Sequence, residues 1–107
     1  MFKLKISPAV REDLADIKRY ITEELSNPDA ALSITAKIIK QIRSAAQFPE
    51  RGAPLSSVIS LQTDYRFLIR ESYLIFYRCE GDTVYVTRVI YQKRDYAQIL
   101  FGISKEE

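Results

Sequence analysis

The spacing of apolar residues changes once along this chain, and that change constrains the fold more than any other feature. In the first half, apolar side chains recur every three or four positions, as at Val10, Leu14 and Ile17, which is the spacing of an amphipathic helix. From Tyr65 onward, apolar and aromatic residues alternate with other residues or form short continuous runs, which indicates β-strands. Helices followed by strands predict an α+β domain.

Two proline signals mark the starts of the expected helices. In Ser7-Pro8 and in Asn27-Pro28, a capping side chain precedes a proline at the first helical position. We expect the first helix to end near Leu25 or Ser26 and the second near Gln47. So short a connection makes the two helices an antiparallel hairpin. A short strand is expected before them, over residues 2–6, because apolar and lysine side chains alternate there.

Three strands are expected after a loop that contains two prolines and a glycine, over residues 48–54. They lie at residues 65–70, 73–79 and 83–91, and the assignment of residues 55–63 stays open. A short terminal segment, a helix or a coil, ends at Gly102. The order is therefore β-α-α-β-β-β with a possible last helix, in one domain over residues 1–107. The helical hairpin is expected to pack on one face of a small antiparallel sheet and to leave the other face partly open, with basic and aromatic side chains on it.

Missing residue types exclude several classes of chemistry. The chain has no histidine, which excludes Ser-His-Asp and Cys-His catalysis and any His-ligated metal site. Its one cysteine, Cys79, excludes an internal disulfide and a zinc cluster. No glycine-rich phosphate loop is present. We therefore expect no metal and no cofactor, and any catalysis must use Arg, Lys, Tyr, Asp or Glu.

Charge and hydropathy indicate where the chain acts and what it contacts. No apolar run is long enough to cross a membrane, and the N-terminus lacks the apolar stretch of a secretory signal, so we expect a cytoplasmic protein without membrane contact. The net charge is +2, but residues 37–94 carry ten basic and five acidic side chains. This imbalance indicates a polyanionic or acidic partner, or else the solvated surface of a mildly basic protein.

Three arginines within the strands are candidates for ligand contact. Arg66 and Arg70 lie four residues apart, so both point to one face of the sheet, either to contact a phosphate or partner or to face solvent. Arg88 is in phase with the apolar residues Val84, Val86 and Ile90. A buried arginine needs a carboxylate or carbonyl partner, so we favour an ion pair with a helix carboxylate over a ligand contact.

A second group of candidates, Lys93, Arg94 and Tyr96, follows the last strand. A well-placed arginine such as Arg94 can stabilise a developing phosphorane charge. Tyr96 can stack on a base or act as a weak acid. The alternative is that these residues only cap the terminal segment.

Taken together, these segments resemble the RelE/ParE superfamily of bacterial type II toxins over nearly the whole chain. The resembling segments are Ile6-Ser7-Pro8-Ala9, Asp13-Leu14, Ile17, Tyr20-Ile21, Asn27-Pro28, Ala30-Ala31, Phe48-Pro49-Glu50-Arg51-Gly52, Tyr65-Arg66, Tyr73-Leu74-Ile75-Phe76-Tyr77, Arg88-Val89-Ile90-Tyr91 and Arg94-Asp95-Tyr96. The resemblance implies a helical hairpin packed on an antiparallel sheet. It also implies a growth-inhibiting toxin that a small cognate antitoxin neutralises.

Two mechanisms occur in this superfamily, and the residue pattern favours one of them. RelE-like members cut messenger RNA on the ribosome with several cations and a tyrosine, whereas ParE-like members inhibit DNA gyrase. The RelE pattern keeps Arg66 and Arg94 in this chain. Its other positions fall on Leu68 and Leu74 and near Leu100. Losing members of such a cationic set costs orders of magnitude in rate, so we expect a ParE-like toxin directed at gyrase.

Two alternatives stay open at this point. One is a RelE-like ribosome-dependent endoribonuclease that acts on mRNA through Arg66 and Arg94. The other is a non-toxic module that represses its own operon and reaches operator DNA only through the antitoxin.

Overall fold

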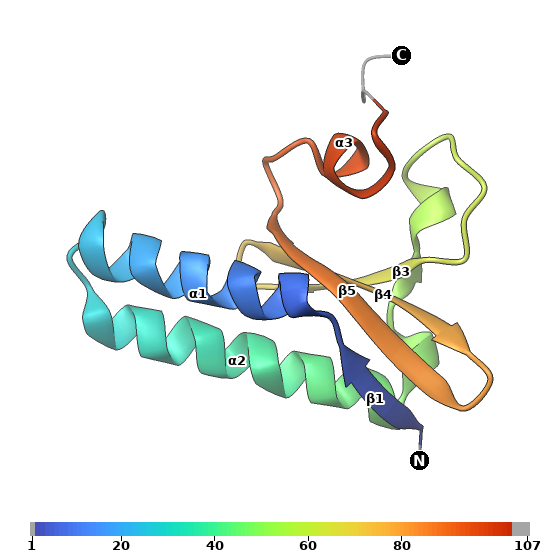
Figure 1. Cartoon of the computed structure of the whole chain (residues 1–107), viewed down its shortest axis with the longest axis horizontal. Helices are drawn as coiled ribbons and strands as arrows, with labels where there is room; N and C mark the ends of the chain where they lie inside the picture. Colours follow the sequence, from blue (N-terminus) through green and yellow to red (C-terminus); the bar gives the residue numbers. More distant parts are fainter. Residues whose placement is uncertain (1, 104–107) are drawn as a thin grey trace.

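The computed structural model describes residues 2–103 and confirms the expected α+β class (Figure 1), with one additional two-residue strand inside the segment expected to be a loop, residues 48–54. The elements are β1 (Lys3–Ile6), α1 (Pro8–Glu23), α2 (Pro28–Gln47), the 3₁₀ turn η1 (Pro49–Arg51), β2 (Ala53–Pro54), the 3₁₀ turn η2 (Leu55–Ser57), β3 (Arg66–Arg70), β4 (Tyr73–Glu80), β5 (Thr83–Tyr91) and α3 (Tyr96–Phe101). The terminal segment is therefore a helix. The open assignment of residues 55–63 resolves as a 3₁₀ turn followed by irregular chain.

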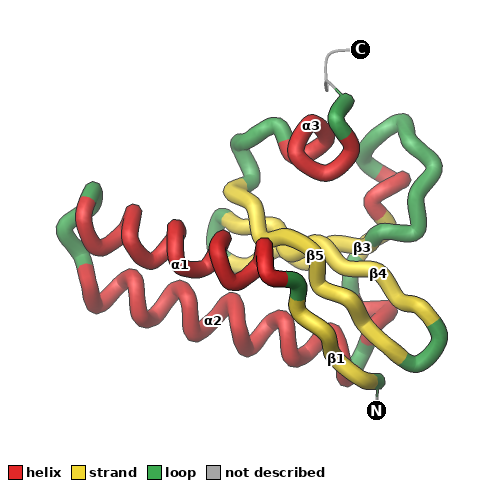
Figure 2. The backbone as a smooth tube through the Cα atoms, viewed as in Figure 1, coloured by secondary structure: helices red, strands yellow, loops and turns green. Residues whose placement is uncertain are grey.

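One five-stranded sheet forms the centre of the molecule, with the strand order β1-β5-β4-β3-β2. The first strand, β1, runs parallel to β5, and the other neighbouring strands are antiparallel. The pairing of β1 with β5 extends only from Lys3↔Thr83 to Ile6↔Val86. Beyond Val86, β5 therefore has no strand on its outer side, and α1 begins there instead (Figure 2).

The two proline signals start the helices as expected. The Ser7 side chain accepts a hydrogen bond from Val10 N, and the Asn27 side chain accepts one from Ala30 N. Helix α1 ends at Glu23, slightly before the expected Leu25 or Ser26. Its end is set by Ser26, whose φ of 51° is left-handed and lets Asn27 N donate to Ile21 O.

The α1–α2 hairpin packs on one face of the sheet and encloses the first core. The buried members of this core are Val10, Ile17, Ile21, Ala31, Ile38, Ile42, Ala45, Leu68, Ile75, Tyr77, Val84, Val86 and Val89. Each helix contributes apolar residues at helical spacing, so the stripes predicted from the sequence are the ones that are buried.

The second face is covered over part of its area and stays open elsewhere, where Ile69 is 55% exposed and Lys5 lies over the half-buried ring of Tyr85. A second core lies on that face, and its buried members are Leu55, Leu74, Phe76 and Ile90. Helix α3 and the chain around η2 cover it from the same side of the sheet (Figure 2). The ring of Tyr65 meets the ring of Phe101 edge-on at 5.7 Å and joins these two covers.

No helix within residues 2–103 combines the length and the apolar character needed to cross a membrane.

Candidate functional site

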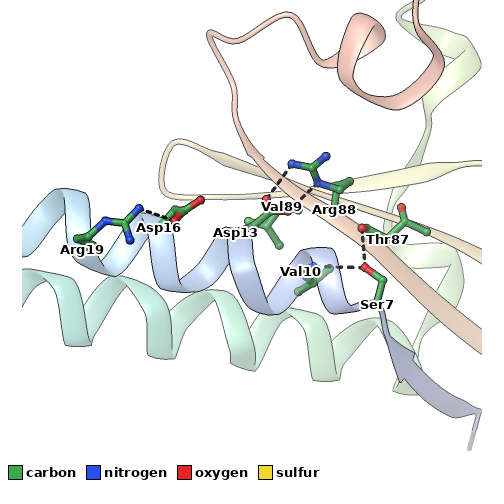
Figure 3. Close-up of polar contacts among 8 residues, drawn as sticks. All are labelled: Ser7, Val10, Asp13, Asp16, Arg19, Thr87, Arg88 and Val89. Atoms are coloured by element: carbon green, nitrogen blue, oxygen red, sulfur yellow. Dashed lines mark hydrogen bonds and ion pairs between the residues drawn. The ribbon is translucent and has the colours of Figure 1, made fainter.

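Arg88 is held by α1, as the favoured interpretation of its position predicts. Its Nε and Nη2 atoms donate to the two carboxylate oxygens of Asp13 at 2.9 and 2.8 Å (Figure 3). This bidentate pair raises the pKa of Arg88, and the largest cause is its hydrogen bonding to the Asp13 carboxylate. The same carboxylate also accepts a hydrogen bond from Val89 N at 2.9 Å. Asp13 therefore takes the place of a neighbouring strand along the outer edge of β5.

A β-bulge next to this ion pair corrects the expected phase of Arg88. The register changes between Phe76 and Tyr77 of β4, so Phe76 pairs with Arg88 while Tyr77 pairs with Val86. Thr87 is the extra residue, and its carbonyl accepts a hydrogen bond from Ser7 Oγ at 2.8 Å (Figure 3). The bulge shifts the alternation of β5 by one residue. The earlier prediction that Arg88 shares its phase with Val84 and Val86 is therefore wrong.

Arg66 is tied to the loop that follows α2. Its Nη1 atom donates to the Gly52 carbonyl at 2.7 Å. The buried Tyr77 hydroxyl accepts a hydrogen bond from Gly52 N at 2.9 Å and donates to Pro49 O at 2.6 Å. Burial is the main cause of the raised pKa of Tyr77. A Cβ atom at residue 52 would collide with the Tyr77 hydroxyl, so only glycine fits there.

The sequence pattern missed this role of Tyr77 because β4 and β5 contain two tyrosines each, and nothing in the sequence singles out one of them. Its one signal was the glycine within the loop over residues 48–54, since a glycine can mark a close approach of another group to the backbone. Arg66 also lines a cleft of about 430 Å³, which we call the second cleft. Its other lining residues are Phe2, Gln47, Phe48, Pro49, Glu50 and Cys79.

A larger cleft, of about 580 Å³, lies between α1, the β3–β4 turn and the end of β5. We call it the first cleft, and its lining residues are Asp13, Asp16, Ile17, Tyr20, Ile21, Leu25, Ile34, Glu71, Ser72, Tyr73, Val89, Ile90, Tyr91 and Arg94. The rings of Tyr73 and Tyr91 lie 5.7 Å apart in its wall. Burial is the main cause of the raised pKa of Tyr73, and Tyr91 adds to it. Tyr73 therefore stays a neutral hydrogen-bonding group at physiological pH.

Three cationic residues lie at or just after strand ends near the first cleft: Arg70 ends β3, and Lys93 and Arg94 follow β5. Arg70 pairs across the strands with Tyr73, which in turn pairs with Tyr91, and Lys93 and Arg94 follow shortly after Tyr91. All three are exposed, and within residues 2–103 their side chains form no ion pair or hydrogen bond. We call these three residues the cationic end. They are available to an incoming partner, whereas Arg66 and Arg88 already have partners.

Tyr96 lies away from the first cleft. It is the first residue of α3, and its ring packs against Phe76 of the second core with ring centres 5.5 Å apart. The candidates identified from the sequence thus separate into three structural positions and the cationic end. Within residues 2–103, no group of three potential ligands is placed to hold a metal ion.

Comparison with known proteins places this geometry in a family. The model of the family described as the ParE toxin of the type II toxin–antitoxin system parDE matches residues 4–96. Among curated proteins, no sequence matches the chain significantly.

Two solved structures share the fold. The chromosomal ParDE toxin–antitoxin system from P. aeruginosa has a TM-score of 0.70 at 24% identity, over 85% of this chain and 96% of that chain. The toxin–antitoxin complex RelBE2 from Mycobacterium tuberculosis has a TM-score of 0.57 at 18% identity, over 84% of this chain and 96% of that chain. The helical hairpin on a five-stranded sheet is therefore an arrangement that known toxin–antitoxin structures share.

Proposed function

Because this chain belongs to the ParE toxin family of type II toxin–antitoxin systems, we propose that it arrests growth by inhibiting DNA gyrase and that a cognate antitoxin neutralises it. The arrest takes place in the cytoplasm, where gyrase and its DNA substrate are found. The choice of gyrase is supported by which residues occupy the RelE-type positions and by where this fold places them.

One observation carries the choice of gyrase over RNA cleavage: the two cations kept from the RelE pattern do not share a cleft. Arg66 lines the second cleft and is bonded to the Gly52 carbonyl, whereas Arg94 lines the first cleft. Cleaving RNA without histidine requires several cations aimed at one phosphorane. Cations in separate clefts do not meet that requirement.

The remaining RelE-type positions are occupied by leucines that pack in the two hydrophobic cores. Leu68 belongs to the first core and Leu74 to the second, and each is only 7% exposed. Leu100 of α3 packs against the second core. These three positions supply packing and offer no charge to a substrate.

The exposed cationic end suits a toxin that acts by binding. Unpaired arginines and lysines beside a tyrosine-lined cleft attract an acidic surface and guide its approach. A toxin that acts only by binding needs no catalytic groups. We therefore assign the contact with gyrase to Arg70, Lys93 and Arg94.

The proposal is tested by inducing the chain in a bacterium that lacks the antitoxin and following DNA and protein synthesis in one culture by pulse labelling. We expect DNA synthesis to stop first and DNA-damage signalling to rise. Purified chain is expected to inhibit supercoiling by purified gyrase in the same series. Co-expression of the cognate antitoxin is expected to restore growth.

Other results would point to the alternatives. Arrest of protein synthesis within minutes, with ribosome-dependent mRNA cleavage that Arg66→Ala and Arg94→Ala abolish, would favour a RelE-like endoribonuclease. Absence of any growth effect at high expression would favour a module that serves only to repress its operon with the antitoxin. Either result would refute gyrase inhibition by this chain.

A further inference from the structure

We propose that the outer face of the α1–α2 hairpin, turned away from the sheet, binds the phosphate backbone of duplex DNA without reading its sequence. The face carries four exposed cations, Arg11 and Lys18 on α1 and Lys40 and Arg43 on α2. We call these four residues the hairpin cations. The contact goes beyond the proposed function, because the target of growth arrest is assigned to the cationic end, on another surface.

The carboxylates of α1 lie on the side of the helix that faces β5 and the first cleft. Asp13 and Glu12 both act on Arg88 of β5: hydrogen bonding to Asp13 is the largest cause of its raised pKa, and the charge of Glu12 adds to it. Asp16 lines the first cleft. Glu23 follows Asp16 by two helical turns, so it lies on the same side.

The cations of α1 lie on the opposite flank. Arg11 and Lys18 are two helical turns apart, and Leu14 between them packs against the first core. Both side chains are exposed, and neither forms an ion pair or hydrogen bond within residues 2–103. Arg19, the other cation of this helix, is bonded to Asp16 at 2.6 Å. The charges of α1 are therefore separated by side, with the unpaired positive charge on the outer flank.

Helix α2 extends this positive surface. Its only carboxylate is Asp29, in the first turn. Lys37 points to the β3–β4 turn, where it bonds Glu71 at 3.1 Å. Lys40 and Arg43 are exposed near the end of the helix and have no partner in the described part of the chain. The C-terminal half of α2 thus presents positive charge that no carboxylate of the helix balances.

The hairpin brings these two sets of cations together. The helices run side by side in opposite directions, and Phe2 N donates to Ala46 O, so the start of α1 lies near the end of α2 (Figure 1). Arg11 and Lys18 are roughly 10 Å apart along their helix, and packed helix axes lie about 8–10 Å apart. A DNA duplex carries about one phosphate per 1.7 Å of its axis. A stretch of duplex as long as this face therefore offers several phosphates to the four cations.

The face lacks the features that other polyanionic partners require. Helix α2 has no aromatic residue, and Tyr20 of α1 lines the first cleft, whereas single-stranded nucleic acids are held largely by bases stacked on aromatic side chains. On α2, only Leu32 and Ile39 are large exposed apolar residues, 56% and 38% exposed. A helix that binds a lipid surface inserts a continuous apolar face. A rigid duplex needs only cations within reach of its phosphates.

The test is a titration of a short, fluorescently labelled DNA duplex of mixed sequence with purified chain, followed by fluorescence anisotropy at several salt concentrations. Four phosphate contacts predict that the logarithm of the binding constant falls with the logarithm of the salt concentration with a slope of about −3.6. Binding should therefore weaken about 150-fold between about 50 mM and about 200 mM salt.

Paired substitutions locate the contact. Arg11→Ala with Lys18→Ala, and Lys40→Ala with Arg43→Ala, should each make the slope shallower by about 1.8, since each pair removes two phosphate contacts. Lys3→Ala with Lys5→Ala is the matched control, because it removes the same charge from β1, where the two side chains contact Asp82 and the Tyr85 ring. The control should leave the slope unchanged.

A second measurement, NMR titration of the backbone amides of the unsubstituted chain, keeps the test valid if a variant fails to fold. We expect the duplex to shift the resonances around the hairpin cations. Shifts confined to the cationic end, a slope that the paired substitutions do not change, or no binding of the duplex would overturn the inference. It would also be overturned if poly-glutamate displaced the labelled duplex as well as unlabelled duplex does, or if single-stranded RNA or phosphatidylglycerol vesicles bound more tightly.

Discussion

Arginines of similar appearance in the sequence have different roles at the residue scale. Arg66 and Arg88 lie in strands. Arg66 donates a hydrogen bond to the Gly52 carbonyl and Arg88 to the Asp13 carboxylate, so both guanidinium groups already have partners within the molecule. Arg70 ends β3 and Arg94 lies in the turn after β5, and within residues 2–103 neither side chain forms an ion pair or hydrogen bond, although Glu71 and Asp95 directly follow them in the sequence. The difference depends on tertiary neighbours, which strand phase alone does not reveal.

Asp13→Ala is expected to destabilise the fold by about 2 kcal/mol, because it leaves both the Arg88 guanidinium and Val89 N without their acceptor. Urea unfolding of the purified variant measures this change. Asp16→Ala removes an ion pair whose two side chains are both more than 60% exposed, so it is the control and should change stability little. Equal effects of the two substitutions would contradict the anchoring role of Asp13.

Tyr77→Phe is expected to cost about 1–3 kcal/mol, because it leaves Gly52 N and Pro49 O buried without their hydroxyl partner. The loss would appear as a lower midpoint in thermal unfolding. Tyr85→Phe is a matched control, since the half-buried Tyr85 ring contacts Lys5 through its face. A Tyr77→Phe variant as stable as the parent would show that the loop over residues 48–54 does not depend on this hydroxyl.

At the scale of elements, local signals set the helices and long-range contacts set the rest. The starts of α1 and α2 were predictable because Ser7, Asn27 and their prolines act within one turn. The bulge at Thr87 was not predictable, because it is held by Ser7, which is 80 residues away in the chain. The cover over the second face was missed for the same reason, since α3 and Tyr65 gain their apolar partners only in the folded sheet.

Removal of the chain from Tyr96 onward is expected to expose the second core and to lower stability by about 3 kcal/mol or more. The exposed Phe76 and Ile90 would bind the dye ANS, and the increase in its fluorescence measures the effect. Gln98→Ala, at an exposed position of α3, is the control and should not increase ANS binding. A truncated chain that stays stable and binds no dye would show that α3 is not needed to cover this face.

At the scale of the whole molecule, we expect that removing the charges of the cationic end lowers growth inhibition without changing the stability of the fold. The combined variant Arg70→Ala, Lys93→Ala and Arg94→Ala removes exposed cations that support no contact within residues 2–103, so its unfolding midpoint should match that of the parent. Its growth inhibition after induction should fall at least tenfold if these cations contact the target, since each exposed charge pair contributes up to about 1 kcal/mol.

Arg43→Ala serves as the control for loss of positive charge and should arrest growth like the parent. Full toxicity of the combined variant would place the target contact elsewhere. A variant that neither folds nor arrests growth would instead assign these residues a structural role.

The parallel pairing of β1 with β5 joins the first strand of the domain to the last, Lys3 to Thr83. Contacts between such distant residues slow folding, because the intervening chain must be ordered before they form. During synthesis, the sheet therefore cannot close until Val86 has left the ribosome, and the N-terminal half emerges long before it has a strand to pair with. A partner already present in the cell can thus meet this chain before its sheet is complete.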